Sequence, residues 1–221
     1  MSSDPNPPPT SHRRAKSGAA RAPGRVRWRR FAIMFVPAAG VTALLLGLTA
    51  NGALASSFSI SGQQFKVSAD SLTGTQGFQQ FGTIDYTAGH TPIPVAESEI
   101  GHAEITNLCQ SVVTNLGPLG DWTLKITAGN NGTPVSADSL IIDANQLSGS
   151  TATFSNINIG QDASTLGDVS GGATGAAGTF GQEATGVTIS GLQQTAYSTS
   201  AGTFTLPGFS LSFSSGANAC F

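Results

Sequence analysis

The stretch GTFTLPGFSLSF, residues 202–213, indicates the fold most clearly. Apolar and polar residues alternate in it with a period of two, which is the period of a half-buried β-strand. Pro207-Gly208 divides the stretch, and this pair is a turn signal, so two strands joined by a turn are predicted. The apolar residues, expected to share one face and to pack in the core, are Phe204, Leu206, Phe209, Leu211 and Phe213.

The same alternation recurs through residues 56–221, where helix signals are nearly absent. The length of this part suits one domain. We therefore predict an all-β fold, a single antiparallel β-sandwich or curved-sheet domain. VSGGATGAAGTFG, residues 169–181, is too rich in Gly for a packed strand and is expected to be a flexible loop.

The hexamer VSADSL occurs twice, at residues 67–72 and 135–140. In a strand its Val and Ala would point to one side, and the Asp-Ser step would bend the chain because an Asp side chain can bond the backbone two residues on. A looser copy, ANQLSGS at 144–150, matches ADSLTGT at 69–75. We interpret these copies as quasi-repeated strand-turn units. They are too few and too uneven for a regular solenoid.

Charge divides the chain in two. Eight of the ten Lys and Arg residues precede position 31, whereas eleven of the twelve acidic residues follow position 55. Residues 56–221 thus hold two lysines and eleven acids, a formal charge of −9. Nucleic acid requires a basic surface, so no nucleic acid partner is expected for them. Residues 1–30 are too polar to form a core and are predicted to be a disordered, basic, cytoplasmic lead.

An uncharged apolar run, FAIMFVPAAGVTALLLGLTA, follows at residues 31–50. About 20 apolar residues cross a bilayer as a helix, and basic residues before such a helix stay in the cytoplasm. Ala53 and Ala55 fit the small-x-small rule for signal-peptidase cleavage. Residues 31–55 are therefore predicted to be a signal peptide or a retained membrane anchor helix, and residues 56–221 an exported β domain. The protein would lie on the extracytoplasmic face of the cell membrane, or be secreted after cleavage.

The chain has two cysteines, Cys109 and Cys220. Disulfides persist in oxidising, exported compartments, so we predict a bridge between them. The bridge would close a loop of more than a hundred residues and hold the C-terminus against the body of the domain. For a loop of this length the chain-entropy model gives about 4–5 kcal/mol as an upper figure.

The segment HTPIPVAESEIGHAE, residues 90–104, contains the polar residues best suited to catalysis or metal binding. Imidazole and carboxylate groups suit zinc, and a serine beside a histidine can act as nucleophile and base. Neither arrangement has a recognised spacing here, and two prolines are typical of a loop. We therefore expect a solvated acidic loop, and we predict no catalytic residue, no metal and no cofactor. The candidate polar residues are His90, Glu97, Ser98, His102 and Glu104.

Several longer segments carry a resemblance: FKVSADSLTGTQGFQQFGTID, ITNLCQSVV, LIIDANQLSGSTATFSNINIGQDAS, AGTFGQEATGVTISGLQQTAYSTSAGTFTLPGFSLSF and the closing CF. They resemble an uncharacterised actinobacterial family of exported or membrane-anchored proteins, sometimes labelled cholesterol esterase. The resemblance covers nearly all of residues 56–221. It implies an envelope location in filamentous Gram-positive bacteria and a multi-pass membrane protein as partner. It transfers no catalytic residue.

Three classes of function remain. An α/β-hydrolase needs Gly-x-Ser-x-Gly at a strand-to-helix elbow, and the nearest strings, GFSLS (208–212) and TISGL (188–192), each lack a required Gly. A lipid ester hydrolase is therefore the least supported class. A lipid-binding carrier would need a groove lined by Phe and Leu. The expected function is a non-catalytic cell-envelope protein, structural or accessory to a membrane partner.

Overall fold

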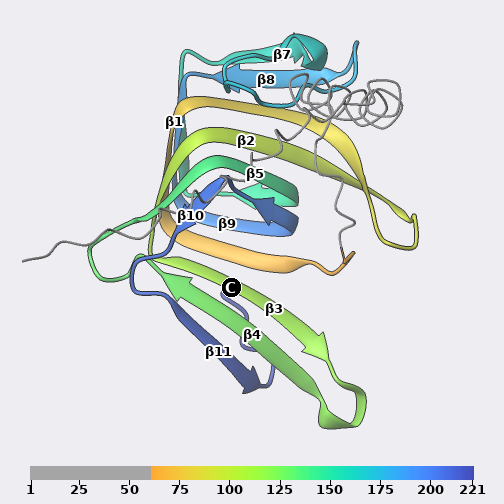
Figure 1. Cartoon of the computed structure of the whole chain (residues 1–221), viewed down its shortest axis with the longest axis vertical. Coiled ribbons are helices and arrows are strands. Elements are labelled where there is room, and N and C mark those ends of the chain that lie inside the picture. Colours follow the sequence, from red (N-terminus) through yellow and green to blue (C-terminus); the bar gives the residue numbers. More distant parts are fainter. Residues whose placement is uncertain (1–60) are drawn as a thin grey trace, which may run out of the picture. The chain divides into compact units, whose positions relative to one another are not determined.

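The computed structural model describes residues 61–221, which form an all-β domain (Figure 1). Every strand of this range belongs to one eleven-stranded sheet, and paired strands are antiparallel. The all-β antiparallel prediction is therefore confirmed, and the strands form one curved sheet. The described residues contain no helix long and apolar enough to cross a membrane. The segment predicted to do so, residues 31–50, lies outside the described range.

The strands differ greatly in length, and two 3₁₀ turns are the only helical elements of residues 61–221. In chain order the elements are β1 (Phe65–Tyr86), β2 (Pro92–Thr106), β3 (Leu108–Asn115), η1 (Gly117–Leu119), β4 (Asp121–Ala128), β5 (Val135–Ser148), β6 (Thr151–Ser155), β7 (Asn158–Asp162), η2 (Ala163–Thr165), β8 (Phe180–Ala184), β9 (Gly186–Ser200), β10 (Thr203–Thr205) and β11 (Ser210–Ser215).

Four long strands close into a ring. β1 pairs with both β2 and β9, and β5 pairs with the same two strands from the other side. The main hydrophobic core takes residues from all four strands, and the largest of them include Leu72, Phe78, Ile100, Ile105, Leu140, Ile142, Ile189 and Leu192. Their burial drives ring closure, because each apolar side chain removed from water stabilises the fold by about 1.5–3 kcal/mol.

β1 is long, and it pairs with several strands because it bends at a bulge. Its register with β2 shifts between Thr75 and Phe78. Gln76 and Gly77 have φ values of 60° and 95° at this bulge. A Cβ atom on residue 77 would overlap the carbonyl oxygen of Asp168, so only glycine fits there. Beyond the bulge, β1 also pairs with β8, which carries β7 along its other edge at one end of the domain (Figure 1).

A second extension, here called the wing, consists of β3, β4 and β11. It joins the ring where Lys66–Ser68 of β1 pair with Cys109–Ser111 of β3. β11 pairs with β4 alone and forms the outer edge (Figure 1). The predicted turn before β11 is present, since the Phe209 amide donates to the Leu206 carbonyl at 3.2 Å and Gly208 has a φ of 66°.

Both copies of VSADSL lie inside strands, β1 and β5, and their burial is nearly identical. In each copy Val and Ala are buried two residues apart, and Leu is buried three residues later. The Asp-Ser step therefore changes which face the following residues occupy, while the strand continues. The prediction of equivalent strands is confirmed for burial, although Ser139 has a φ of 50° and its counterpart Ser71 has no positive φ. The predicted turn is wrong. Strand pairing on both sides supplies the backbone hydrogen bonds that a turn would have needed.

The structure joins Cys109 and Cys220 by a disulfide, as the sequence predicted, with Cα atoms 5.9 Å apart and 111 residues of separation. The C-terminal tail that carries Cys220 crosses one face of the wing. The Thr123 hydroxyl donates to the Gly216 carbonyl at 2.6 Å, and the Cys220 amide donates to the Ser111 hydroxyl at 2.9 Å. The bridge thus fastens the tail to β3 in addition to these hydrogen bonds.

Candidate functional site

Four of the five candidate polar residues lie in one strand, β2, and not in a loop. The predicted solvated loop is therefore wrong. Pro92 and Pro94, which suggested it, pair with β1 at the start of β2, before the pairing with β5 begins at Ala96. One edge of β2 is free there, and a strand tolerates proline where its missing N–H faces no partner.

The strand separates Ser98 from His102, the serine and histidine considered above as a nucleophile and its base. Ser98 is buried, and its hydroxyl accepts a hydrogen bond from the Gln80 amide at 2.7 Å. The His102 Nδ1 atom lies 2.7 Å from the Asp138 carboxylate near the surface. Glu104 is exposed, and His90 lies in the β1–β2 turn with a φ of 59°. The structure therefore does not bring these candidates together as a nucleophile and its base.

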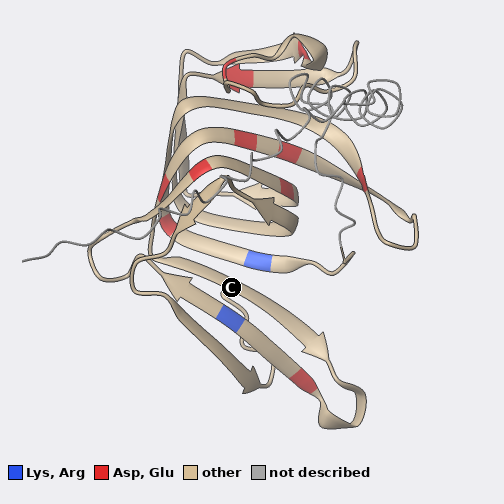
Figure 2. Ribbon diagram, viewed as in Figure 1, with Lys and Arg blue, Asp and Glu red and all other residues tan. Residues whose placement is uncertain are grey.

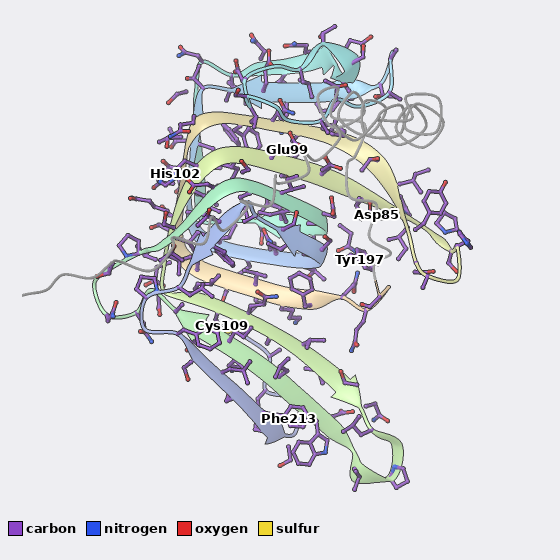
Figure 3. The ribbon with its side chains drawn as sticks, in the orientation of Figure 1. Asp85, Glu99, His102, Cys109, Tyr197 and Phe213 are labelled. Carbon is purple, nitrogen blue, oxygen red and sulfur yellow. A yellow bond between two sulfur atoms is a disulfide. The ribbon has the colours of Figure 1, made fainter. Side chains whose placement is uncertain are left out.

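Glu97, by contrast, belongs to a cluster of acids from β1, β2 and β5 that also includes Asp85, Glu99 and Asp143. Figure 2 shows the acids of these strands in red, and Figure 3 labels two members of the cluster, Asp85 and Glu99. Glu97 lies directly opposite Asp143 of β5 in the strand register. Burial, followed by the negative charges of Asp143 and Glu99, raises the pKa of Glu97 to about 8. Burial and the charge of Asp85 raise the pKa of Asp143 to about 6, although a hydrogen bond from Ser198 opposes this. The cluster therefore holds protons near neutral pH.

Glu99 lies in the same cluster and is covered by the loop that precedes β8. Only 1% of Glu99 is exposed, and the Ala173 amide donates to its carboxylate at 2.9 Å. The Gln79 side chain donates both to Glu99 and to the Ala173 carbonyl, so it joins strand and loop. A Cβ atom on Gly172 would overlap the Glu99 carboxylate, which explains the glycine. The loop expected at 169–181 is thus present as far as Thr179, and it packs over the acids.

Three buried oxygen acceptors near the cluster have no hydrogen-bond partner among the described residues: Gln79 Oε1, Asp85 Oδ2 and Asp143 Oδ1. A carboxylate cannot donate to them, but a protonated carboxylic acid can. Residues 61–221 contain no group of three or more His, Cys, Asp or Glu side chains arranged to hold a metal ion. The raised pKa values of Glu97 and Asp143 suit this cluster to proton uptake.

Sequence reasoning found Glu97 but missed its partner Asp143 and the role of Gln79. Asp143 did leave a signal, because it is a single carboxylate within the apolar run LIIDA of β5. A charge at such a position is costly unless it is paired, bonded or neutralised. The covering loop left no comparable signal, since its glycines are equally typical of a mobile segment.

One comparison with known proteins decides the family. A family model described as a family of unknown function, DUF6230, matches residues 61–221. The chain belongs to this family. No curated protein and no solved structure was found to match it. The matched residues are those that form the ring, the wing and the β7–β8 extension, so family membership describes the β domain.

The DUF6230 domain also has a small cavity inside the ring. Its volume is about 90 Å³, and its lining is mainly apolar, with contributions from Leu72, Phe78, Ile100, Ile142 and Leu192. A cavity of about 150 Å³ holds one benzene molecule. The ring interior is therefore too small for a lipid acyl chain in this conformation.

The raised pKa values predict that the DUF6230 domain loses stability as the pH rises. The folded state holds a proton on Glu97 up to about pH 8, whereas the ordinary pKa of 4.5 applies after unfolding. The native state therefore binds more protons between these values, and the free energy of unfolding falls across this window. Urea titrations at pH 5, 6, 7 and 8 would measure the slope.

Glu97→Gln is the informative variant for this pH dependence, because glutamine has the shape of the glutamate side chain and cannot ionise. We expect it to flatten the fall in stability above pH 6, where Asp143 contributes less. Glu104→Gln removes an exposed carboxylate from the same strand and should leave the slope unchanged. A wild-type stability that rises between pH 6 and pH 8 would contradict the prediction.

Proposed function

We propose that this DUF6230 protein is a non-catalytic, extracytoplasmic component of the cell envelope, structural or accessory to a membrane partner. The observation that carries the proposal is the Cys109–Cys220 disulfide. Such a bridge persists in oxidising compartments, in agreement with the basic lead and apolar run that precede the domain. An actinobacterial source and a multi-pass membrane partner follow from the family resemblance and complete the proposal.

The two alternative functions have less support. A lipid ester hydrolase needs a nucleophile and a base in contact, whereas Ser98 is bonded to Gln80 and His102 contacts Asp138. A carrier that encloses a lipid needs an interior larger than the cavity of about 90 Å³ in the ring. A structural or accessory role needs neither feature.

The lysines of this chain provide a test of the proposed location. The sequence contains three: Lys16 in the basic lead, and Lys66 and Lys125 in the β domain. A membrane-impermeant amine reagent, applied to intact cells stripped of their wall, is expected to label Lys125 and to spare Lys16. Mass spectrometry of the tryptic peptides would read both sites. The mature N-terminus in the same experiment would separate a retained anchor from cleavage before Ser56.

Permeabilised cells serve as the control, because there Lys16 should react as well. Labelling of Lys16 together with protection of Lys125 in intact cells would contradict the proposed orientation. Protection of both lysines would place the whole chain inside the cell and would contradict the envelope location.

A further inference from the structure

The wing has an apolar face that the described chain leaves uncovered. In the register of β4 and β11, Leu211 lies opposite Ile126 and Phe213 lies opposite Leu124. The Trp122 and Phe213 rings stack with their centroids 5.0 Å apart. Leu211 is 54% exposed and Phe213 57% exposed. The prediction that the stripe of residues 204–213 packs in the core holds for Leu206, which contacts the main core, and is wrong for Leu211 and Phe213. Figure 3 shows Phe213 on the wing, away from the ring.

The opposite face of the wing is polar, and the chain covers that face with its own tail. Thr123 is fully buried between its bonds to Gly216 and to the Asn218 amide. Cys220 then anchors the tail to β3. A folded protein normally buries the apolar face of a sheet and exposes the polar one. The reversed arrangement indicates that something beyond these residues covers the apolar face.

Charge distinguishes the wing from the remainder of the domain. Its three strands carry one acid, Asp121, and one lysine, Lys125, so they are neutral overall. The other lysine of the domain, Lys66, lies where the wing joins the ring, and ten of the eleven acids lie outside the wing (Figure 2). An anionic surface would therefore repel the ring and accept the wing.

The start of the described chain also lies at this face. Ser61 and Gln63 line a groove together with Leu124 and Ile126 of the apolar face. The Gln63 side chain donates to the Val113 carbonyl at 2.9 Å, which holds this entry point against β3. Ten residues separate Ala50, the end of the apolar run, from Ser61. Even fully extended, they span at most about 40 Å.

We propose that the apolar face of the wing, formed by Trp122, Leu124, Ile126, Leu211 and Phe213, docks on the outer surface of the membrane. The inference rests on the proposed function, because a retained anchor at residues 31–50 keeps the wing within reach of the bilayer. Tryptophan and phenylalanine bind at the headgroup boundary, with their rings in the apolar layer. A second copy of the chain is the alternative occupant of this face.

Trp122 provides a direct test. The chain has two tryptophans, and Trp28→Phe leaves Trp122 as the only fluorophore of this type. The full-length variant is reconstituted into vesicles of phosphatidylglycerol and phosphatidylethanolamine, with or without bromine atoms on the acyl chains near the headgroup. Bromine quenches tryptophan on contact, so we expect Trp122 emission to fall about twofold in the brominated vesicles, as for an interfacial side chain.

Two matched double variants test whether the apolar face of the wing causes the quenching of Trp122. Leu211→Ser with Phe213→Ser removes exposed apolar side chains from the wing and should abolish most of the quenching. Ile159→Ser with Phe180→Ser removes side chains that are 67% and 60% exposed on the β7–β8 extension, and should leave the quenching unchanged. Thermal unfolding of all variants checks that each remains folded.

The outcomes separate the docking proposal from the proposed function. If the chain floats with the vesicles but Trp122 is equally bright with and without bromine, docking is overturned and the envelope role stands. A dimer in native mass spectrometry with Trp122 shielded would assign the face to a second copy, which also overturns docking. A chain that does not float with the vesicles overturns both.

Discussion

Replacing Cys109 and Cys220 together by serine is expected to lower the free energy of unfolding by about 4 kcal/mol. The bridge spans 111 residues of sequence, so its loss frees a very long loop in the unfolded chain. The double variant is preferable to a single one, because it leaves no free thiol to react between molecules. Urea unfolding followed by circular dichroism would measure the difference from the oxidised wild-type protein.

The folded state adds a second contribution to this loss. Once the bridge is absent, the tail is held to the wing by hydrogen bonds such as those of Thr123 and Ser111. We therefore expect the residues after Gly216 to become the first site of proteolysis. Ala219→Ser changes the same tail without breaking the bridge and should alter the stability by less than about 0.5 kcal/mol. Equal midpoints for the oxidised wild type and the double variant would contradict the prediction.

The second large effect concerns the repeated hexamer. Leu72→Ala and Leu140→Ala are each expected to cost about 3 kcal/mol, which combines lost burial with the cavity that remains. The two leucines are 2% and 1% exposed and occupy the same place in the two copies of VSADSL. Their costs should therefore agree to within about 1 kcal/mol, the spread expected from local relaxation.

Leu119→Ala provides the matched control for the leucine variants. This leucine lies in η1 and is 71% exposed, so its truncation should be nearly neutral. Urea midpoints would give the stability loss of each of the three variants relative to the wild-type protein. A large cost at one hexamer and none at the other would show that the two copies are not structurally equivalent, whatever their identical sequence.

The sequence predicted the strands well because their signal is local. Alternation in GTFTLPGFSLSF is visible without knowing any partner, and the Pro207-Gly208 turn is equally local. The sequence of a strand does not show which of its faces is buried, because burial depends on what packs against that face. Leu211 and Phe213 alternate as core residues do, yet they are exposed because no strand or loop of residues 61–221 covers the wing there.

The candidate site shows the same division between local and distant information. Glu97 was identifiable as an acid near other polar residues, but its pKa depends on burial and on Asp143, which lies 46 positions later and directly opposite it on the neighbouring strand β5. The separation of Ser98 from His102 follows from strand geometry, which the two prolines of the segment obscured. Pairing between distant strands is what a single sequence does not reveal.

Closure of the ring has a consequence for the time at which the protein folds. Phe65 of β1 pairs with Ala196 of β9, so the ring cannot form until the later residue has been synthesised. At ordinary rates of translation the 131 residues from Lys66 to Ala196 take about 7–26 s. Pairings of such high contact order also form slowly once the chain is complete. The order of the strands therefore leaves the ring open for that interval, which suits the proposed export of the domain through a translocation channel.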